Sequence, residues 1–303
     1  TNASIGLHTA KQDSTPLVLF IGHVPSAEMG REAFQEIDYP SAFGPLTKRV
    51  IEVMRPEDVA QATADALHQS TAGRPGPVAV VLPEDVTEGE AGAVDIPQPR
   101  QRATLLPNAD DIANAVRLID AAEHPVIIGG GQINFENAHD ALAQFAEASG
   151  AGVVSAFRRQ DILPHEHHAN LGHFGLHLVP YQKKFWADCD LVILAGARPD
   201  GATLQGYSLL RPDQRIIHIY PEDAAFAQTN PDMALKADAG PSLAALRTGL
   251  ESPPASSRLA WRAVHHQEHI THATPGRDAA AQSLGAVDMA EIIFGQDTME
   301  NNC

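Results

Sequence analysis

The sequence predicts an α/β protein with two parallel-sheet domains, each built in three layers. Short apolar runs such as VAVVLP (78–83) and LVILAGA (191–197) lack polar alternation, which is typical of strands buried on both faces of a parallel sheet. These runs alternate with segments of helical length, the pattern of βαβ units. The chain has 303 residues, enough for two domains of ordinary size.

The first domain is expected to end with the segment GRPGPVAVVLPEDV (73–86). Gly73 can end a helix because glycine adopts the left-handed conformation at little cost, and Pro75 and Pro77 prevent the helix from resuming. Pro56 suits the first turn of the helix that precedes this segment. The elements expected up to this point are a helix at 3–14, strands at 16–23, 47–53 and 78–83, and a helix from Pro56 to about residue 72.

Residues 83–107 are rich in Glu, Gly, Pro and Gln and show no periodicity, which indicates a connection between domains. The domain borders predicted from this change are 1–90 for the first domain, 91–107 for the linker, 108–252 for the central domain, and 253–303 for a second linker and the start of a further domain.

The central domain repeats the alternation of strands and helices. Its expected strands are PVIIGGG (125–131), GVVSAF (152–157), DLVILAGAR (190–198) and RIIHIYPED (215–223). Helices are expected from Asp110 or Asp111 to about residue 122 and at about 136–149, 181–187 and 240–251, with an irregular stretch at 164–178.

Composition narrows the classes of partner. The formal net charge is 21 − 38 = −17, which argues against nucleic acid and against an anionic membrane surface as the main partner. No apolar run approaches the roughly 20 residues of a membrane span. Only Cys189 and Cys303 are present, so we expect no disulfide framework and a reducing cytoplasmic location.

Candidate binding residues lie where the predicted central strands end, because ligands of open parallel sheets bind outside the carboxyl ends of strands. Gly130 and Gly131 allow close approach of a backbone to a ligand. Arg198 and Asp200 follow the next strand and suit a phosphate and a ribose, and Glu222 suits a ribose hydroxyl. Each strand end is also typical of an ordinary turn or solvated loop. Together they favour a nucleotide-sized ligand.

Two groups of histidines and one irregular segment stand out. One histidine group lies in a single loop and the other on one helical face: His165, His167, His168, His173 and His177, then His265, His269 and His272. No cysteines or repeated ligand spacing accompany them, so we expect exposed or capping histidines and no metal ligands. Residues 31–50 mix aromatic and charged residues too irregularly for one helix, which is typical of a functional loop or of an ordinary loop with aromatic anchors.

The segment GRPGPVAVVLPEDV resembles SGRPGPVLVDIPKDV, which ends the pyrimidine-binding domain of thiamine diphosphate enzymes of the acetolactate synthase type. Other segments are similar to the family's in the same order along residues 1–250: TNASIGLHTAKQDSTPLVLFIGHVP, REAFQEIDYPSAFGPLTK, PVIIGGG, HHANLGHFGLH, LVILAGARPD and IIHIYPED. Within this pattern His23 replaces the glutamine of the family's GQVP, and GARPDGATLQGY lacks the family's second arginine.

The resemblance implies a partial pyrimidine-binding domain, a Rossmann-like middle domain, and an enzyme that decarboxylates or condenses 2-oxo acids. The implied cofactors are thiamine diphosphate and Mg²⁺, with FAD or ADP in the middle domain, and the implied assembly is a homodimer or homotetramer. The cage around Arg74 is then structural. The substrate-side residues implied are His23, Phe34, Gln35 and Lys48, and the cofactor-side residues are Asn2, Gly130, Gly131, His177, Arg198, Asp200 and Glu222.

The family's catalytic glutamate strand and its GDG…NN segment are not found in this sequence, and the Asn301-Asn302 pair has no GDG ahead of it. We therefore expect a fragment of such an enzyme that is inactive alone and contains no catalytic residue. The alternatives are a non-catalytic nucleotide-binding or regulatory protein, and one half of a split enzyme.

Overall fold

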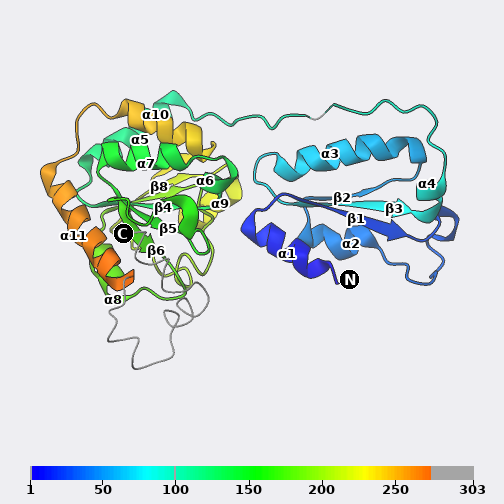
Figure 1. Cartoon of the computed structure of the whole chain (residues 1–303), viewed down its shortest axis with the longest axis horizontal. Helices are drawn as coiled ribbons and strands as arrows, with labels where there is room; N and C mark the ends of the chain where they lie inside the picture. Colours follow the sequence, from blue (N-terminus) through cyan, green and yellow to red (C-terminus); the bar gives the residue numbers. More distant parts are fainter. Residues whose placement is uncertain (1, 99, 274–303) are drawn as a thin grey trace, which may run out of the picture.

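A computed structural model of the chain describes residues 2–98 and 100–273. It has two lobes side by side, each built on a parallel sheet, with an extended connection running between α4 and α5 (Figure 1). This arrangement confirms the predicted fold class of two parallel-sheet α/β domains. Among the described helices, none combines the length and the apolar character that a membrane crossing requires.

The first lobe contains a three-stranded sheet. Its strands, in spatial order, are β1 (Leu17–His23), β3 (Pro77–Pro83) and β2 (Arg49–Glu52). The central strand β3 is the predicted VAVVLP run, and its residues 78–81 are completely buried. Its helices are α1 (Ser4–Asp13), α2 (Tyr39–Phe43), α3 (Val59–Thr71) and α4 (Glu84–Glu88). Gly73 has φ = +57°, the left-handed conformation predicted for the turn after α3.

The second lobe contains a six-stranded parallel sheet. Its strands, in spatial order, are β6 (Asn170–His173), β5 (Gly152–Ser155), β4 (Pro125–Gly129), β7 (Leu191–Ala195), β8 (Arg215–Ile219) and β9 (Met233–Leu235). The chain builds outward from β4 to β6 and then returns to place β7 on the other side of β4. The strand order therefore reverses between β4 and β7. Such a topological switch point is where doubly wound sheets bind ligands.

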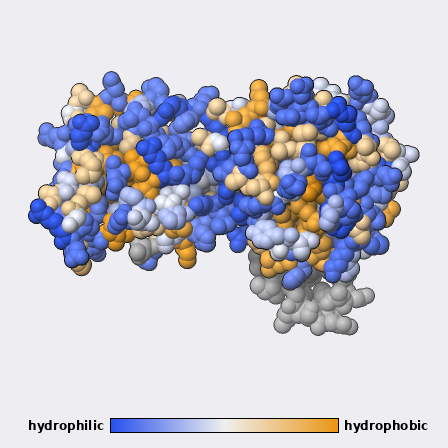
Figure 2. All heavy atoms as spheres, turned by 180° about the vertical axis from the view of Figure 1, so that it is seen from behind, coloured by the Kyte–Doolittle hydropathy of each residue, from blue (hydrophilic) through white to orange (hydrophobic). Residues whose placement is uncertain are grey.

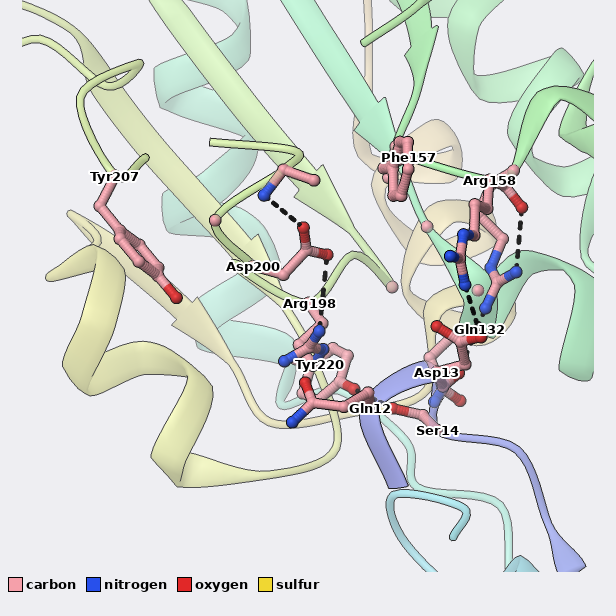
Figure 3. A pocket seen from close by; sticks show the side chains of 17 residues that line it. Gln12, Asp13, Ser14, Gln132, Phe157, Arg158, Arg198, Asp200, Tyr207 and Tyr220 are labelled. Carbon is pink, nitrogen blue, oxygen red and sulfur yellow. Dashed lines mark hydrogen bonds and ion pairs between the residues drawn. The ribbon is translucent and has the colours of Figure 1, made fainter. Parts of the chain in front are cut away.

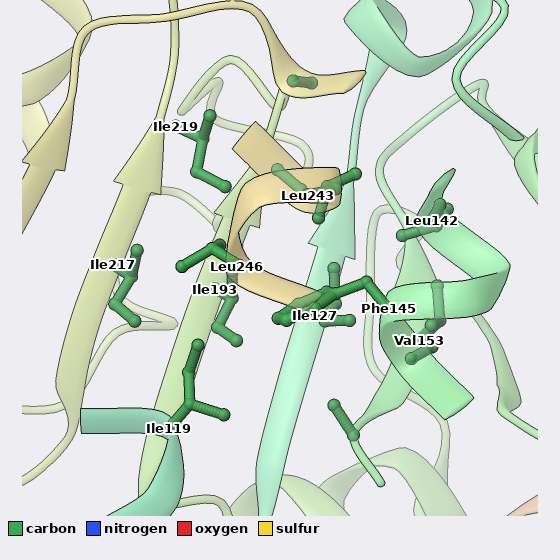
Figure 4. Close-up of a cluster of buried hydrophobic side chains, with 14 of the residues drawn as sticks. Ile119, Ile127, Leu142, Phe145, Val153, Ile193, Ile217, Ile219, Leu243 and Leu246 are labelled. Atoms are coloured by element: carbon green, nitrogen blue, oxygen red, sulfur yellow. The ribbon is translucent and has the colours of Figure 1, made fainter. Parts of the chain in front are cut away.

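Helices cover both faces of this sheet. They are α5 (Ala109–Ala121), α6 (Gly131–Phe135), α7 (His139–Ser149), α8 (Pro180–Asp188), α9 (Asp223–Thr229), α10 (Ala239–Gly249) and α11 (Ser256–Ala273). Side chains alternate across each strand: Ile127 packs with Phe145 and Leu246 on one face (Figure 4), while Ile128 packs with Phe185 on the other. Burial of each such side chain contributes about 1.5–3 kcal/mol.

Several short elements differ from the sequence-based expectations. Strand β6 lies inside the stretch expected to be irregular, β9 and α9 follow the predicted strands without having been expected, and α6 separates β4 from α7. Strands of three or four residues carry too little periodicity to be recognised. Helix α11 lies in the range assigned to a linker and a further domain, yet it packs against α8 and β6 of the second lobe. The rest of that range, 274–303, lies outside the described residues, and the domain borders stay predictions.

His218 on β8 is completely buried, and its ring is held at both nitrogens. The carbonyl oxygen of Ala197 can only accept, so Nε2–H donates to it over 3.1 Å, and Nδ1 accepts from the Thr229 hydroxyl over 2.9 Å. Burial lowers the pKa of His218 from 6.5 to about 4, so the folded protein holds this imidazole neutral.

This neutral histidine predicts acid sensitivity. Between about pH 6.5 and pH 4 the unfolded chain binds the proton and the folded chain does not, so the free energy of unfolding falls as the pH is lowered through this window. His218 contributes about 3 kcal/mol to that fall. The His218→Gln variant should lose part of the slope in urea unfolding followed by circular dichroism from pH 4 to pH 7. The exposed His8→Gln variant is the control, and an unchanged slope in His218→Gln would contradict the assignment.

Candidate functional site

A cleft with a volume of about 310 Å³ lies at the topological switch point, where the carboxyl ends of β4, β5 and β7 face the first lobe (Figure 3). The second lobe supplies most of its wall. The first lobe supplies the end of α1, through Gln12, Asp13 and Ser14. The cleft is therefore lined by residues of both lobes.

Glycines bring the loops after β4 and β7 together at the floor of the cleft. A Cβ atom at Gly130 would lie far inside van der Waals contact of the Ala197 Cα and the Gly196 carbonyl oxygen. Gly196 itself has φ = +61°, a conformation that favours glycine. The predicted glycine-rich strand end is thus required by backbone packing, and Gly130 and Gly131 both line the cleft.

Three arginines give the cleft a cationic lining: Arg158 and Arg159, which follow β5, and Arg198, which follows β7. Asp13 and Asp200 are the carboxylates in the lining, at 3.6 Å from Arg158 and 3.8 Å from Arg198 respectively. Three guanidinium groups thus face two carboxylates. This excess of positive charge suits an anionic ligand such as a phosphate.

Gln132 supplies an unused polar atom beside these charges. Its side chain is 98% buried, with 2% exposed, and it lines the cleft. Its Oε1 atom has no hydrogen-bond partner among the described residues. A buried acceptor without a partner is uncommon in folded proteins, so this oxygen is positioned to accept a hydrogen bond from a ligand in the cleft.

The structure gives Asp200 a different setting from the one predicted. Its carboxylate accepts hydrogen bonds from the backbone N–H groups of Ala202 (3.0 Å) and Thr203 (2.9 Å) and from the Thr203 hydroxyl (3.2 Å). Most of its acceptor capacity is used to hold the turn after β7. Asp200 therefore orients Arg198 and this turn, and its carboxylate has little capacity left for a ribose hydroxyl.

Arg74, from the cage around GRPGP, joins the two lobes. Its guanidinium donates to the Ser14 hydroxyl (3.0 Å) and to the Lys11 carbonyl oxygen (2.8 Å), and it pairs with the Glu222 carboxylate of the second lobe at 3.2 Å. The Ser14 hydroxyl also lies 3.2 Å from the Tyr220 hydroxyl. Arg74 therefore has a structural role, as expected, and this role is to connect the two lobes. Glu222 pairs with it beside the cleft instead of lining the cleft.

Two other predicted cofactor residues lie elsewhere. Asn2 is exposed before α1, and the ten-residue length of that helix separates it by about 15 Å from Ser14 in the cleft. His177 lines a separate cavity near β6 and α8. The structure therefore brings Gly130, Gly131, Arg198 and Asp200 together, but not Asn2 or His177.

The first lobe has its own cavity of about 630 Å³ at the carboxyl ends of β1 and β3, and it is lined by His23, Phe34 and Gln35. The His23 ring packs edge-on against Tyr39, with 4.8 Å between centroids, and its Nδ1 atom is buried without a partner among the described residues. The structure thus brings together three of the four predicted substrate-side residues.

Lys48, the fourth predicted substrate-side residue, does not line this cavity. Its Nζ atom donates to the carbonyl oxygens of Gln69 (2.6 Å), Ala72 (2.6 Å) and Arg74 (2.9 Å). These carbonyls belong to the end of α3 and the GRPGP turn, where a cation satisfies groups that a helix end leaves unpaired. Lys48 therefore holds this turn in place, which corrects the expectation that it faces a substrate.

Sequence reasoning missed Arg158, Arg159 and Gln132. The pair of arginines directly follows the predicted strand GVVSAF, so the strand-end rule would have identified it. Gln132 follows the three glycines, but its isolation from hydrogen-bond partners depends on tertiary packing and leaves no signal in the sequence.

A family model described as the central domain of thiamine pyrophosphate enzymes matches residues 112–246. The acetolactate synthase large subunit of Corynebacterium glutamicum is 36% identical over 221 residues, which cover 72% of this chain and 35% of that protein. The isozyme 1 large subunit of acetolactate synthase from Escherichia coli is 31% identical over 264 residues, which cover 86% of this chain and 46% of that protein.

A solved structure of a proposed thiamin diphosphate-dependent enzyme from Mycobacterium smegmatis has the same fold. It matches with a TM-score of 0.70 and 23% sequence identity, over 83% of this chain and 49% of that one. The chain thus spans about a third to a half of the length of the curated relatives it matches.

The Arg74 junction yields a test of how the lobes are held. Arg74→Ala removes the hydrogen bonds to Ser14 and Lys11 and the pairing with Glu222, so we expect the lobes to separate on average. Small-angle scattering should then give a larger radius of gyration, and unfolding should divide into two transitions. The control is Arg49→Ala, an exposed arginine on β2. A single transition with an unchanged radius would show that Arg74 does not hold the lobes.

Proposed function

Since the chain belongs, through residues 112–246, to the thiamine pyrophosphate enzyme family, we propose that it serves in a carboligase or decarboxylase of 2-oxo acids that resembles acetolactate synthase. The observation that carries this proposal is the similarity to acetolactate synthase large subunits, which extends over 72–86% of the chain and therefore over both lobes. The 2-oxo acid substrate, and the choice between forming and breaking a carbon–carbon bond, are parts of this proposal.

Thiamine diphosphate and Mg²⁺ are the proposed cofactors of that activity. When bound, thiamine diphosphate would supply the carbanion chemistry that is needed to break or form a carbon–carbon bond at the carbonyl carbon of a 2-oxo acid. Within the described residues the one group of three metal-ligand side chains that lie close together is Glu147, His167 and His168, which is not the set of oxygen ligands that Mg²⁺ prefers. We therefore assign no Mg²⁺ ligand here. In the first-lobe cavity, His23, Phe34 and Gln35 are proposed to face the substrate.

The cleft between the lobes is proposed to bind ADP or FAD. Arg198, Arg158 and Arg159 supply the positive charge that a diphosphate requires, and the packed loops at Gly130 form a rigid floor. The buried Oε1 atom of Gln132, which has no partner among the described residues, is proposed to accept a hydrogen bond from the nucleotide. The residues present thus fit a nucleotide diphosphate. When bound, FAD would add a redox-active ring, whereas ADP would add none.

A second candidate function is nucleotide binding without catalysis, in a regulatory protein or in one half of a split enzyme. It is favoured by the cleft itself, because its arginine lining suits a nucleotide diphosphate whether or not thiamine diphosphate is bound. Binding of ADP or FAD without any affinity for thiamine diphosphate would support this candidate over the first.

We also propose a cytoplasmic homodimer or homotetramer. The first lobe exposes large apolar side chains at Ile5, Phe20 and Phe34, whose exposed fractions are 79%, 50% and 87%. Figure 2 shows such hydrophobic residues on the surface of this lobe. A second copy that covers them would remove apolar surface from water.

The activity is tested with the complete open reading frame that encodes this chain. We expect its purified product to release CO₂ from pyruvate or a related 2-oxo acid when thiamine diphosphate and Mg²⁺ are supplied, while residues 1–303 alone release none. A complete product that binds ADP or FAD but neither binds thiamine diphosphate nor releases CO₂ would exclude the first candidate and leave the second.

The nucleotide site is tested by titration calorimetry of ADP and FAD into the chain. Arg198→Ala removes a charge-assisted hydrogen bond to phosphate, so the dissociation constant should rise about tenfold or more. Arg215→Ala is the matched control, because this exposed arginine lies at the opposite end of the neighbouring strand β8 and pairs with Asp232. Equal affinities for the two variants and the unmodified chain would rule out a phosphate at Arg198.

A further inference from the structure

The second lobe contains another cavity, of about 420 Å³, that neither the nucleotide cleft nor the substrate-side cavity includes. Residues around β6, α8 and the end of α11 form its wall. Five histidines line it: His165, His173, His177, His269 and His272. Four of these side chains are exposed, whereas His269 is buried, with 7% of its surface exposed.

The hydrogen bonds of His269 fix which ring nitrogen carries the proton. The Tyr181 hydroxyl donates its one hydrogen to the carbonyl oxygen of Leu171 over 3.2 Å. Its 3.2 Å contact with Nδ1 of His269 therefore requires that Nδ1–H be the donor. The other nitrogen, Nε2, then has a lone pair and no hydrogen, and it has no partner among the described residues.

The residues around His269 leave room for these two hydrogen bonds, from His269 to Tyr181 and from Tyr181 to Leu171. Gly172 has φ = +96°, and a Cβ atom there would lie 2.5 Å from the Tyr181 hydroxyl and 3.0 Å from Nδ1 of His269. Only glycine therefore leaves room for the two rings to meet. A histidine that binds a metal through one nitrogen usually donates its other N–H to a fixed acceptor, which is the arrangement that Tyr181 provides.

We propose that this cavity binds a divalent transition-metal ion such as Zn²⁺ or Ni²⁺, with Nε2 of His269 as the fixed ligand and the exposed His165, His173 and His272 as the ligands that close around it. The ring of His165 already meets that of His269 edge-on, at 4.8 Å between centroids. Imidazole is a preferred ligand of these ions. This proposal differs from the sequence-based expectation of no metal ligands, which stays a prediction.

The tighter group of Glu147, His167 and His168 is a weaker candidate for the same ion. Nδ1 of His167 accepts from the Ala169 N–H (3.2 Å), so its Nε2 carries the proton and faces the Glu147 carboxylate at 3.4 Å. These groups satisfy one another. Burial and then the positive charge of Arg262 lower the pKa of His168, and this guanidinium would repel a cation.

The test uses Co²⁺ as a spectroscopic probe on the full chain, followed by competition with Zn²⁺ and calorimetry with Ni²⁺. We expect one ion per chain, with visible d–d absorption typical of nitrogen ligands. His269→Gln and the exposed His165→Gln should each weaken binding at least tenfold. Tyr181→Phe, which leaves Nδ1 without its acceptor, should weaken it by about tenfold.

The matched control is His167→Gln, which should bind Co²⁺ as the unmodified chain does. Circular dichroism checks that each variant is folded, and His165→Gln keeps the test valid if His269→Gln does not fold. Unchanged affinity in His165→Gln, loss of binding in His167→Gln, absence of binding in the unmodified chain, or several equivalent ions per chain would each overturn the proposal.

Discussion

The reversal of strand order between β4 and β7 is the constraint on which the site depends. The chain leaves these neighbouring strands toward opposite sides of the sheet, and such a reversal opens a crevice at the carboxyl edge. Gly130 lets the backbone of one loop pass against Ala197 of the other, and this fixes the floor of the cleft. The guanidinium of Arg198 stands on a turn that Asp200 holds through backbone N–H groups. The strand order thus determines where the cleft lies, and the hydrogen bonds of Asp200 determine where the guanidinium of Arg198 lies.

The two lobes meet through polar groups. Arg74 has the central position at the junction because its planar guanidinium reaches a hydroxyl, a carbonyl and a carboxylate at once. Lys48 fixes the backbone of Arg74, because its Nζ atom donates a hydrogen bond to the carbonyl oxygen of that residue. The Gly/Pro turn, Lys48 and Arg74 therefore form one connected group of hydrogen bonds, which links the end of α3 to the boundary between the lobes.

The long apolar runs predicted the sheets correctly because a run such as Val78–Leu82, which lacks polar alternation, is typical of a strand buried on both faces of a parallel sheet. Short elements such as β6 escaped prediction because they depend on neighbours distant in sequence. The same limit applies to the site. Glycine and arginine at strand ends indicated the cleft, whereas the pairing of Glu222 with Arg74 and the lone pair of His269 are set by tertiary contacts that residue types alone do not encode.

Because Ser14 and Arg198 line the cleft from different lobes, a ligand that fills it also bridges them. Its binding free energy then adds to the cohesion of the chain by mass action, by about 2.7 kcal/mol at a concentration one hundred times its dissociation constant. The resistance of this protein to heat and proteolysis would accordingly rise with the concentration of any ligand that fills the cleft.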